Sequence, residues 1–257
     1  MSSLALAAVI LPTAVAIAFL SGVFGMAGGL VLMGVLLLVL PVPQAMVLHG
    51  MIQTVSNGWR AIVWWRYIKF RMLPPYIAGT LSIAGVLALV RFVPDKSICY
   101  VLMGLLPAIA MLMPNHRVPS MKNPVAAFGG GALQSGLQLT AGAAGPIVDA
   151  MYLSAGLDRR EVVATKAAAV TWSHLTKAVY YGTIWQLTGP DDQDLPLWLY
   201  GAAILMAMLG TTLARGVLER MNNESFIRYS RWLIMGISVV YLTRGIVGLI
   251  GMGGVEP

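Results

Sequence analysis

Long apolar runs without a charged residue recur from one end of the chain to the other, and only short polar stretches separate them. An α-helix needs about 20 apolar residues to cross the hydrocarbon core of a bilayer. Hydrophobic residues make up 58% of the chain and charged residues only 11%, whereas about a quarter of the residues in a soluble domain are charged. The sequence therefore predicts one all-α integral membrane domain, with no room for a separate soluble domain.

Apolar runs bounded by glycine, proline or charge divide the chain into ten predicted helical segments. Two of them, GGLVLMGVLLLVL and GAAGPIVDAMYLSAG, are short for a full span and follow glycine-rich breaks, so we expect half-helices there. The first run lacks the basic flank and cleavage site of a secretory signal and is predicted to be a membrane helix. The segments are 4–24, 27–40, 44–65, 74–92, 97–113, 124–140, 142–156, 160–185, 195–214 and 227–250.

The net charge of +7 comes from basic residues at the ends of apolar segments rather than from one continuous stripe, which argues against nucleic-acid binding. Because lysine and arginine favour cytoplasmic loops, we expect segments 66–71, 115–122 and 215–231 to face the cytoplasm. The acidic loop 189–194 should then lie outside. The predicted location is the inner cell membrane, crossed several times.

An internal repeat is visible in two places along the sequence. SGVFGMAGG at 21–29 aligns with SGLQLTAGA at 135–143, and HGMIQTVSNGWRAIVW at 49–64 aligns with KAAAVTWSHLTKAVYY at 166–181. In the longer of the two alignments, threonine and serine recur at equivalent positions. At other positions of this alignment, cationic or polar residues are aligned with each other. The chain therefore consists of two repeats with a similar residue pattern.

We place these repeats at residues 1–119 and 120–257, with about five helical segments each. Since five is an odd number, the second repeat starts on the opposite side of the membrane from the first, and the two copies are inverted. The predicted fold is therefore a pair of inverted repeats, each containing a glycine-broken half-helix.

Two predicted helices carry most of the polar residues that interrupt the apolar runs. A step of 11 residues returns to nearly the same direction on a helix, so His49 shares a face with Arg60, and Lys166 with Lys177. Charge in hydrocarbon costs several kcal/mol, so these residues are candidates for a site. Two such stripes, each about 16 Å long, would surround an anion if they faced each other across a central cavity. The remaining stripe members are Gln53, Ser56, Asn57, Ser173 and His174.

Four of the stripe residues that carry or can carry charge also have a structural interpretation. Arg60 and Lys177 can extend their charged ends to the membrane interface as anchors. His49 can make a hydrogen bond between packed helices, and Lys166 can anchor the cytoplasmic end of its helix. The repeated placement of Arg60 and Lys177 favours the site for these two residues, whereas for Lys166, which follows Arg159 and Glu161 closely, the anchor is the favoured interpretation.

Asp149 is the only acidic residue in its apolar half-helix. We expect it to be either the counter-ion of a buried base such as Lys177 or His174, or a proton carrier. Together with His49 and His174 it could also belong to a membrane-embedded enzyme, but no metal-binding or acid–base spacing such as HExxH occurs. The single Cys99 excludes an intramolecular disulfide and argues against redox chemistry.

The glycine-rich breaks have two interpretations. Small residues let membrane helices pack closely, and broken helices expose backbone N–H groups that hold an anion at the positive end of the following helix dipole. We favour the second. No Lys-Ser or Lys-Thr pair follows GMAGG, which excludes a nucleotide-binding loop. The candidate residues in and around the breaks are Gly28, Gly142, Ser21, Gln134, Ser135, Gln138 and Thr140.

The motif SGVFGMAGGLVLMGVLLL, its weaker copy with AGAAGPIVDAMYL, and the stretch AVYYGTIW resemble the TauE/SafE sulfite exporter family over nearly the whole chain. This resemblance implies a permease for sulfite, sulfonates and other small sulfur-containing anions that uses no nucleotide motor. The chain departs from the family pattern at Ala27, where glycine is usual, and at Gly34, near a usual proline. The second copy keeps Pro146 but has alanine at positions 141, 143 and 144.

The sequence and the resemblance together predict a secondary transporter for a small sulfur oxyanion, with sulfite export as the implied function and an organosulfonate as the other substrate. No cofactor is expected. An anion channel is the alternative, and saturation or proton coupling of the flux distinguishes the two. Either protons or a counter-anion would drive transport, and the glycine-rich and apolar faces suggest a homodimer.

Overall fold

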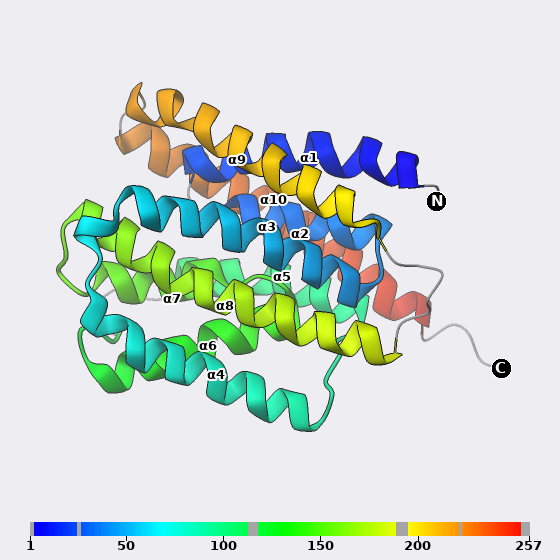
Figure 1. Cartoon of the computed structure of the whole chain (residues 1–257), viewed down its shortest axis with the longest axis horizontal. Coiled ribbons are helices and arrows are strands. Elements are labelled where there is room, and N and C mark those ends of the chain that lie inside the picture. The colour runs from blue at the N-terminus through cyan, green and yellow to red at the C-terminus, as the bar shows by residue number, and fades with distance from the viewer. Residues whose placement is uncertain (1–2, 25–26, 113–117, 189–194, 221–222, 253–257) are drawn as a thin grey trace.

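Every regular element in the described part of the chain is a helix. The computed structural model describes residues 3–24, 27–112, 118–188, 195–220 and 223–252. Figure 1 shows the long helices running side by side as a bundle. The helices are α1 (Ser3–Phe24), α2 (Ala27–Val39), α3 (Val42–Val63), η1 (Trp65–Tyr67), η2 (Phe70–Met72), α4 (Leu73–Leu89), α5 (Lys96–Leu112), α6 (Pro124–Ala141), α7 (Gly145–Leu153), α8 (Arg159–Thr188), α9 (Leu197–Arg220) and α10 (Asn223–Met252).

The helix boundaries follow start and stop signals in the sequence. Proline stands in the first turn of α3, α4 and α6, where its missing N–H costs nothing. The side chain of Asn123 caps α6 by accepting from the backbone N–H of Val125 at 2.9 Å. Gly142 ends α6 with a φ of 84°, a left-handed conformation that favours glycine. Because of this break, α7 starts a few residues later than predicted.

Four helix pairs form the main contacts of the bundle. In these pairs α1 packs along α9, α3 along α8, α4 along α6, and α5 along α10. Figure 1 shows α3 and α8 in the middle of the bundle, with α1 and α9 on one side of them and α4 and α6 on the other. The short helices α2 and α7 contact α3 and α8 respectively, so both half-helices lie against the two helices that carry the polar stripes.

Two of the predicted cytoplasmic segments lie at the same end of the bundle. Met72, which directly follows segment 66–71, shares a buried apolar cluster with Met121 of segment 115–122. This placement agrees with the expectation that both segments face one side of the membrane. The parts of the predicted topology that fall outside the described residues are 115–117, 189–194 and 221–222.

Large apolar side chains cover the outside of the described helices. Leu89, Val125 and Leu197 are each at least 80% exposed, and many others on α4, α8, α9 and α10 are also exposed, far beyond what a soluble protein shows to water. Three described segments are long and apolar enough to cross a bilayer, namely Phe70–Leu89, Leu197–Ala214 and Trp232–Gly251. The prediction of an all-α membrane protein is confirmed.

Candidate functional site

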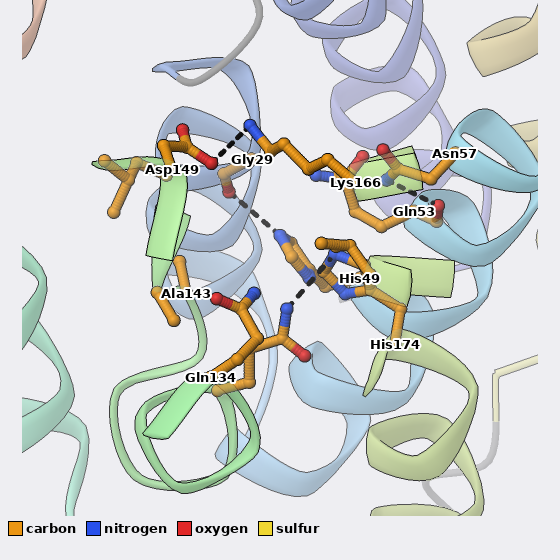
Figure 2. Close-up of a pocket in the computed structure, with 13 residues that line it drawn as sticks. Gly29, His49, Gln53, Asn57, Gln134, Ala143, Asp149, Lys166 and His174 are labelled. Atoms are coloured by element: carbon orange, nitrogen blue, oxygen red, sulfur yellow. Dashed lines mark hydrogen bonds and ion pairs between the residues drawn. The ribbon is translucent and has the colours of Figure 1, made fainter. Parts of the chain in front are cut away.

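A polar cavity of about 60 Å³ lies inside the bundle where α2, α3, α6, α7 and α8 meet. A single water needs roughly 10–15 Å³ on the same basis, so the cavity has room for a small ion. Figure 2 shows side chains from several helices surrounding this space. The lining residues are Gly29, Leu30, His49, Gln53, Asn57, Gln134, Gln138, Ala143, Ala144, Asp149, Lys166, Val170 and His174.

Lys166 of α8 and Asp149 of α7 form an ion pair in the cavity wall (Figure 2). The Asp149 side chain is 8% exposed and that of Lys166 is 25% exposed. The structure thus pairs Asp149 with Lys166, not with Lys177 or His174 as the sequence suggested. The physical reason is that Lys166 faces α7, whereas Lys177 is already held by other groups. Lys166 is therefore a cavity residue rather than an anchor at the helix end.

Lys177 is fully buried and does not line the cavity. Its ammonium group donates to the carbonyl oxygen of Gly142 at 2.9 Å and lies 2.6 Å from Nδ1 of His49. Nε2 of His49 lies 2.9 Å from the carbonyl oxygen of Gly29 (Figure 2). Because a carbonyl only accepts, this Nε2 carries a hydrogen. One hydrogen-bonded chain therefore connects the two glycine-rich breaks through side chains of α3 and α8.

His174 lies next to His49 in the cavity wall, with their ring centroids 5.5 Å apart. Its Nε2 is 3.3 Å from Nε2 of Gln138. Nδ1 of His174 and the side-chain oxygens of Gln134 and Gln138 are buried without a hydrogen-bond partner among the described residues. Buried polar atoms are normally paired, so these atoms are available to a polar ligand. Rotation of either amide would present its N–H₂ group instead.

Both half-helices begin beside the cavity. Gly29 and Leu30 in the first turn of α2 line it, as do Ala143 and Ala144 just before α7. Ala144 caps α7 and provides no side-chain hydrogen bond to its first turn. The N–H groups of a first helical turn have no partner within the helix and lie at the positive end of its dipole. This end of α7 is therefore suited to negative charge.

Two predicted site residues lie on the same helices as the cavity residues but bond elsewhere. Ser56 of α3 is 3.2 Å from the hydroxyl oxygen of Thr211 on α9. Ser173 of α8 is 2.8 Å from the hydroxyl oxygen of Tyr76 on α4. None of these four residues lines the cavity. The two serines connect the central helices to their outer neighbours.

Other predicted residues lie near the cavity but outside its wall. Arg60 donates to the side-chain oxygen of Asn57 at 3.5 Å, and Asn57 itself lines the cavity. Ser135 and Gly28 are buried but do not line it. The side chain of Ser21 falls outside the part of the chain that the structure describes. The stripes predicted from helical spacing are thus broader than the cavity.

Five lining residues were not predicted because none of them has a polar side chain. A signal for one of them exists in the sequence. Lys166, Val170 and His174 are spaced four residues apart, which places them on one face of a helix. A search of the sequence for residues four positions before or after each polar residue would have included Val170. The residues missed are Gly29, Leu30, Ala143, Ala144 and Val170.

The described residues contain no group of three or more His, Cys, Asp or Glu side chains that could hold a metal ion. Neither the curated proteins nor the solved structures give a match to the chain. A comparison with known families matches residues 10–242 to the family described as Sulfite exporter TauE/SafE. This match includes both glycine-rich breaks and all residues of the cavity wall. The resemblance seen in the sequence is confirmed, and the chain belongs to the sulfite exporter TauE/SafE family of membrane transporters.

Proposed function

We propose that this protein is a multi-pass secondary transporter of the inner cell membrane that exports sulfite, with an organosulfonate as the other candidate substrate. The observation that carries the proposal is the cavity at the starts of both half-helices. Its wall contains one lysine, two histidines and four side-chain amides, against one carboxylate that is already paired. Such a set of donors suits a small oxyanion better than a cation or an apolar ligand.

The anion in this proposal accepts hydrogen bonds from several groups at once. The first-turn N–H groups of α7, the amides of Gln134 and Gln138, and the ammonium group of Lys166 are the donors. Hydrogen bonds that involve a charged group contribute about 1.5–3 kcal/mol each. Asp149 competes with the anion for Lys166. This competition keeps the affinity modest, so the anion can leave on the other side.

Arg60 and Lys177 act from outside the cavity wall in this proposal. Arg60 contacts Asn57 at 3.5 Å and attracts the anion toward the cavity by its charge. Lys177 holds His49 in place through Nδ1. The two cations thus have different roles, although they occupy equivalent positions of the aligned repeats.

We also propose that the two halves, 1–119 and 120–257, are inverted repeats. If α1 corresponds to α6, α2 to α7, and so on to α5 and α10, the contact of α1 with α9 corresponds to that of α6 with α4. The contacts of α3 with α8 and of α5 with α10 each correspond to themselves. These four contacts are the four main helix contacts of the bundle, which supports the repeat.

A topology prediction follows from the inverted arrangement. We expect segments 66–71 and 189–194 to face opposite sides of the membrane, because basic loops stay in the cytoplasm and the intervening number of crossings is odd. The measurement is labelling of single cysteines in these two segments by a membrane-impermeant maleimide, in a Cys99→Ala background and in intact cells. Labelling of both segments from the same side would contradict the arrangement.

Flux measurements in proteoliposomes test the proposed function directly. We expect saturable uptake of radiolabelled sulfite that exceeds the leak into protein-free liposomes. When sulfate, thiosulfate and sulfoacetate are compared as competitors, an anion that the protein also transports should inhibit this uptake. Saturation is expected because the number of binding sites is limited and each transport cycle occupies one of them. Flux that rises linearly with sulfite would support a channel, and the absence of flux for all four anions would overturn the proposal.

A further inference from the structure

We propose that Lys177 and His49 together form a proton-binding site, and that a proton binds there together with the anion in the neighbouring cavity. The inference rests on the proposed function and adds its coupling ion. The two residues come from α8 and α3, the central helices of the bundle, and both side chains are fully buried. Only His49 lines the anion cavity.

The geometry of the pair allows one shared hydrogen. Nζ of Lys177 lies 2.6 Å from Nδ1 of His49, so one nitrogen donates and the other accepts. When Lys177 is an ammonium group, His49 is neutral and its Nδ1 accepts. A further proton on Nδ1 removes this lone pair and breaks the hydrogen bond. The pair therefore has protonation states that differ in structure as well as in charge.

Among the described residues, the pair has no counter-ion of its own. The other partner of Lys177 is the neutral carbonyl oxygen of Gly142, and the nearby carboxylate, Asp149, pairs with Lys166. A buried positive charge without a counter-ion is costly. An anion in the cavity would lie one side chain from Lys177, because His49 separates them. Anion and proton therefore favour each other's binding, and both move in the same direction. A sulfite dianion with one proton still carries one net negative charge, so an inside-negative membrane potential drives this pair outward.

In the described residues of helices α2 to α8, the two carboxylates, Asp149 and Glu161, are already paired with lysines, so neither replaces the anion in this role. The helices α2 and α6 carry no titratable side chain in their described residues. His174 lies 5.5 Å from His49 between ring centroids and provides no negative charge. The other titratable or charged side chains that the structure describes on the helices packed around the pair are Arg60 on α3, Arg66 and Tyr67 on η1, Tyr76 on α4, Lys96, Cys99 and Tyr100 on α5, Asp149 and Tyr152 on α7, Arg160, Glu161, Lys166, Tyr180 and Tyr181 on α8, and Tyr200 on α9.

Protonation of the pair also acts on the two half-helices. His49 holds Gly29 at the start of α2, and Lys177 holds Gly142 just before α7. The hydrogen bond between Lys177 and His49 is the link between these two attachments. Loss of this hydrogen bond on binding a second proton would end the connection between the glycine-rich break at the start of α2 and the one before α7. The site thus connects proton binding to the segments that line the cavity.

The test is uptake of radiolabelled sulfite into proteoliposomes, with and without an outside-acidic pH gradient, at a membrane potential clamped by valinomycin and potassium. After subtraction of the protein-free leak, we expect the gradient to increase wild-type uptake about tenfold, as a coupling of typical strength would. Lys177→Gln keeps a polar side chain that can donate hydrogen bonds but cannot titrate. Its uptake should no longer respond to the gradient, while exchange of internal for external sulfite continues. Arg244→Gln, which removes an intramembrane cation exposed on α10, should respond like the wild type.

Each outcome decides between the two proposals. If Lys177→Gln keeps the wild-type response, or if wild-type sulfite uptake ignores the pH gradient, the proton site is wrong and the transport function stands. If the wild type takes up no sulfite, the proposed function fails and the inference fails with it. Should Lys177→Gln not fold, Lys177→Met provides the same test, since its side chain is unbranched, similar in length and uncharged.

Discussion

Sulfite transport should fall strongly when Lys166→Gln and Asp149→Asn are combined in one protein. The double variant removes the charged donor from the cavity wall and leaves no unpaired charge behind. Loss of one charge-assisted hydrogen bond of about 1.5–3 kcal/mol corresponds to a decrease in apparent affinity of roughly 10- to 100-fold. The measurement is the concentration dependence of sulfite uptake in proteoliposomes, after the amount of reconstituted protein has been matched.

The second ion pair of the described structure is the matched control. Lys69 pairs with Glu161 at the end of the bundle, outside the cavity. The double variant Lys69→Gln with Glu161→Gln also removes one cation and one anion, and we expect it to transport like the wild type, since exposed pairs contribute only about 0–1 kcal/mol. Wild-type affinity in the Lys166 and Asp149 double variant, or an equal loss in the control, would contradict the site.

The single variant Lys166→Gln is expected to behave differently from the double variant. It leaves Asp149 charged and buried without its partner, and removal of one member of a buried pair costs about 3–5 kcal/mol. We expect this protein to lose thermal stability in detergent and to regain most of it when Asp149→Asn is added. The melting temperature, followed by size-exclusion chromatography after heating, checks this. An equally stable single variant would show that the carboxylate has another partner.

The helices and the breaks between them could be predicted from the sequence because their signals are local. Each predicted segment corresponds to a helix of the structure, since apolar runs, first-turn prolines and glycines act within a few residues of where they stand. The two half-helices were predicted for the same reason. The start of α7 was misplaced because Gly142 and the following alanines are apolar enough to extend a helical run, while the backbone conformation of Gly142 ends it.

The partners of the polar side chains could not be predicted from local signals. Helical spacing placed His49 and His174 on the polar stripes of their helices, and the structure brings these two together. Spacing does not say which neighbouring helix each part of a stripe meets. Ser56 therefore meets α9 and Ser173 meets α4, and Lys166 rather than Lys177 reaches Asp149. These choices depend on tertiary packing, which no single helix encodes.

Alanine in place of Gly79 or of Gly210 should destabilise the protein more than most single substitutions. A Cβ at Gly79 of α4 would overlap the carbonyl oxygen of Phe128 on α6, and a Cβ at Gly210 of α9 would overlap that of Val15 on α1. Backbone atoms cannot move aside as a flexible side chain can, so each helix pair would have to separate. Overpacking of this kind costs about 1–3 kcal/mol or more. The measurement is the melting temperature in detergent together with the monodisperse fraction.

Each of these helices also provides its own control. Gly85 on α4 and Gly201 on α9 have no atom within 4 Å of the Cβ that alanine would add, so alanine there should leave the melting temperature unchanged or raise it slightly. Under the proposed repeat, the contact of α4 with α6 corresponds to that of α9 with α1, so Gly79→Ala and Gly210→Ala should cause decreases of similar size. A large decrease at one position and none at the other would show that the two interfaces are not equivalent. Equal decreases at Gly85 and Gly201 would instead show that alanine acts through the helix itself, and not through the close approach of two backbones.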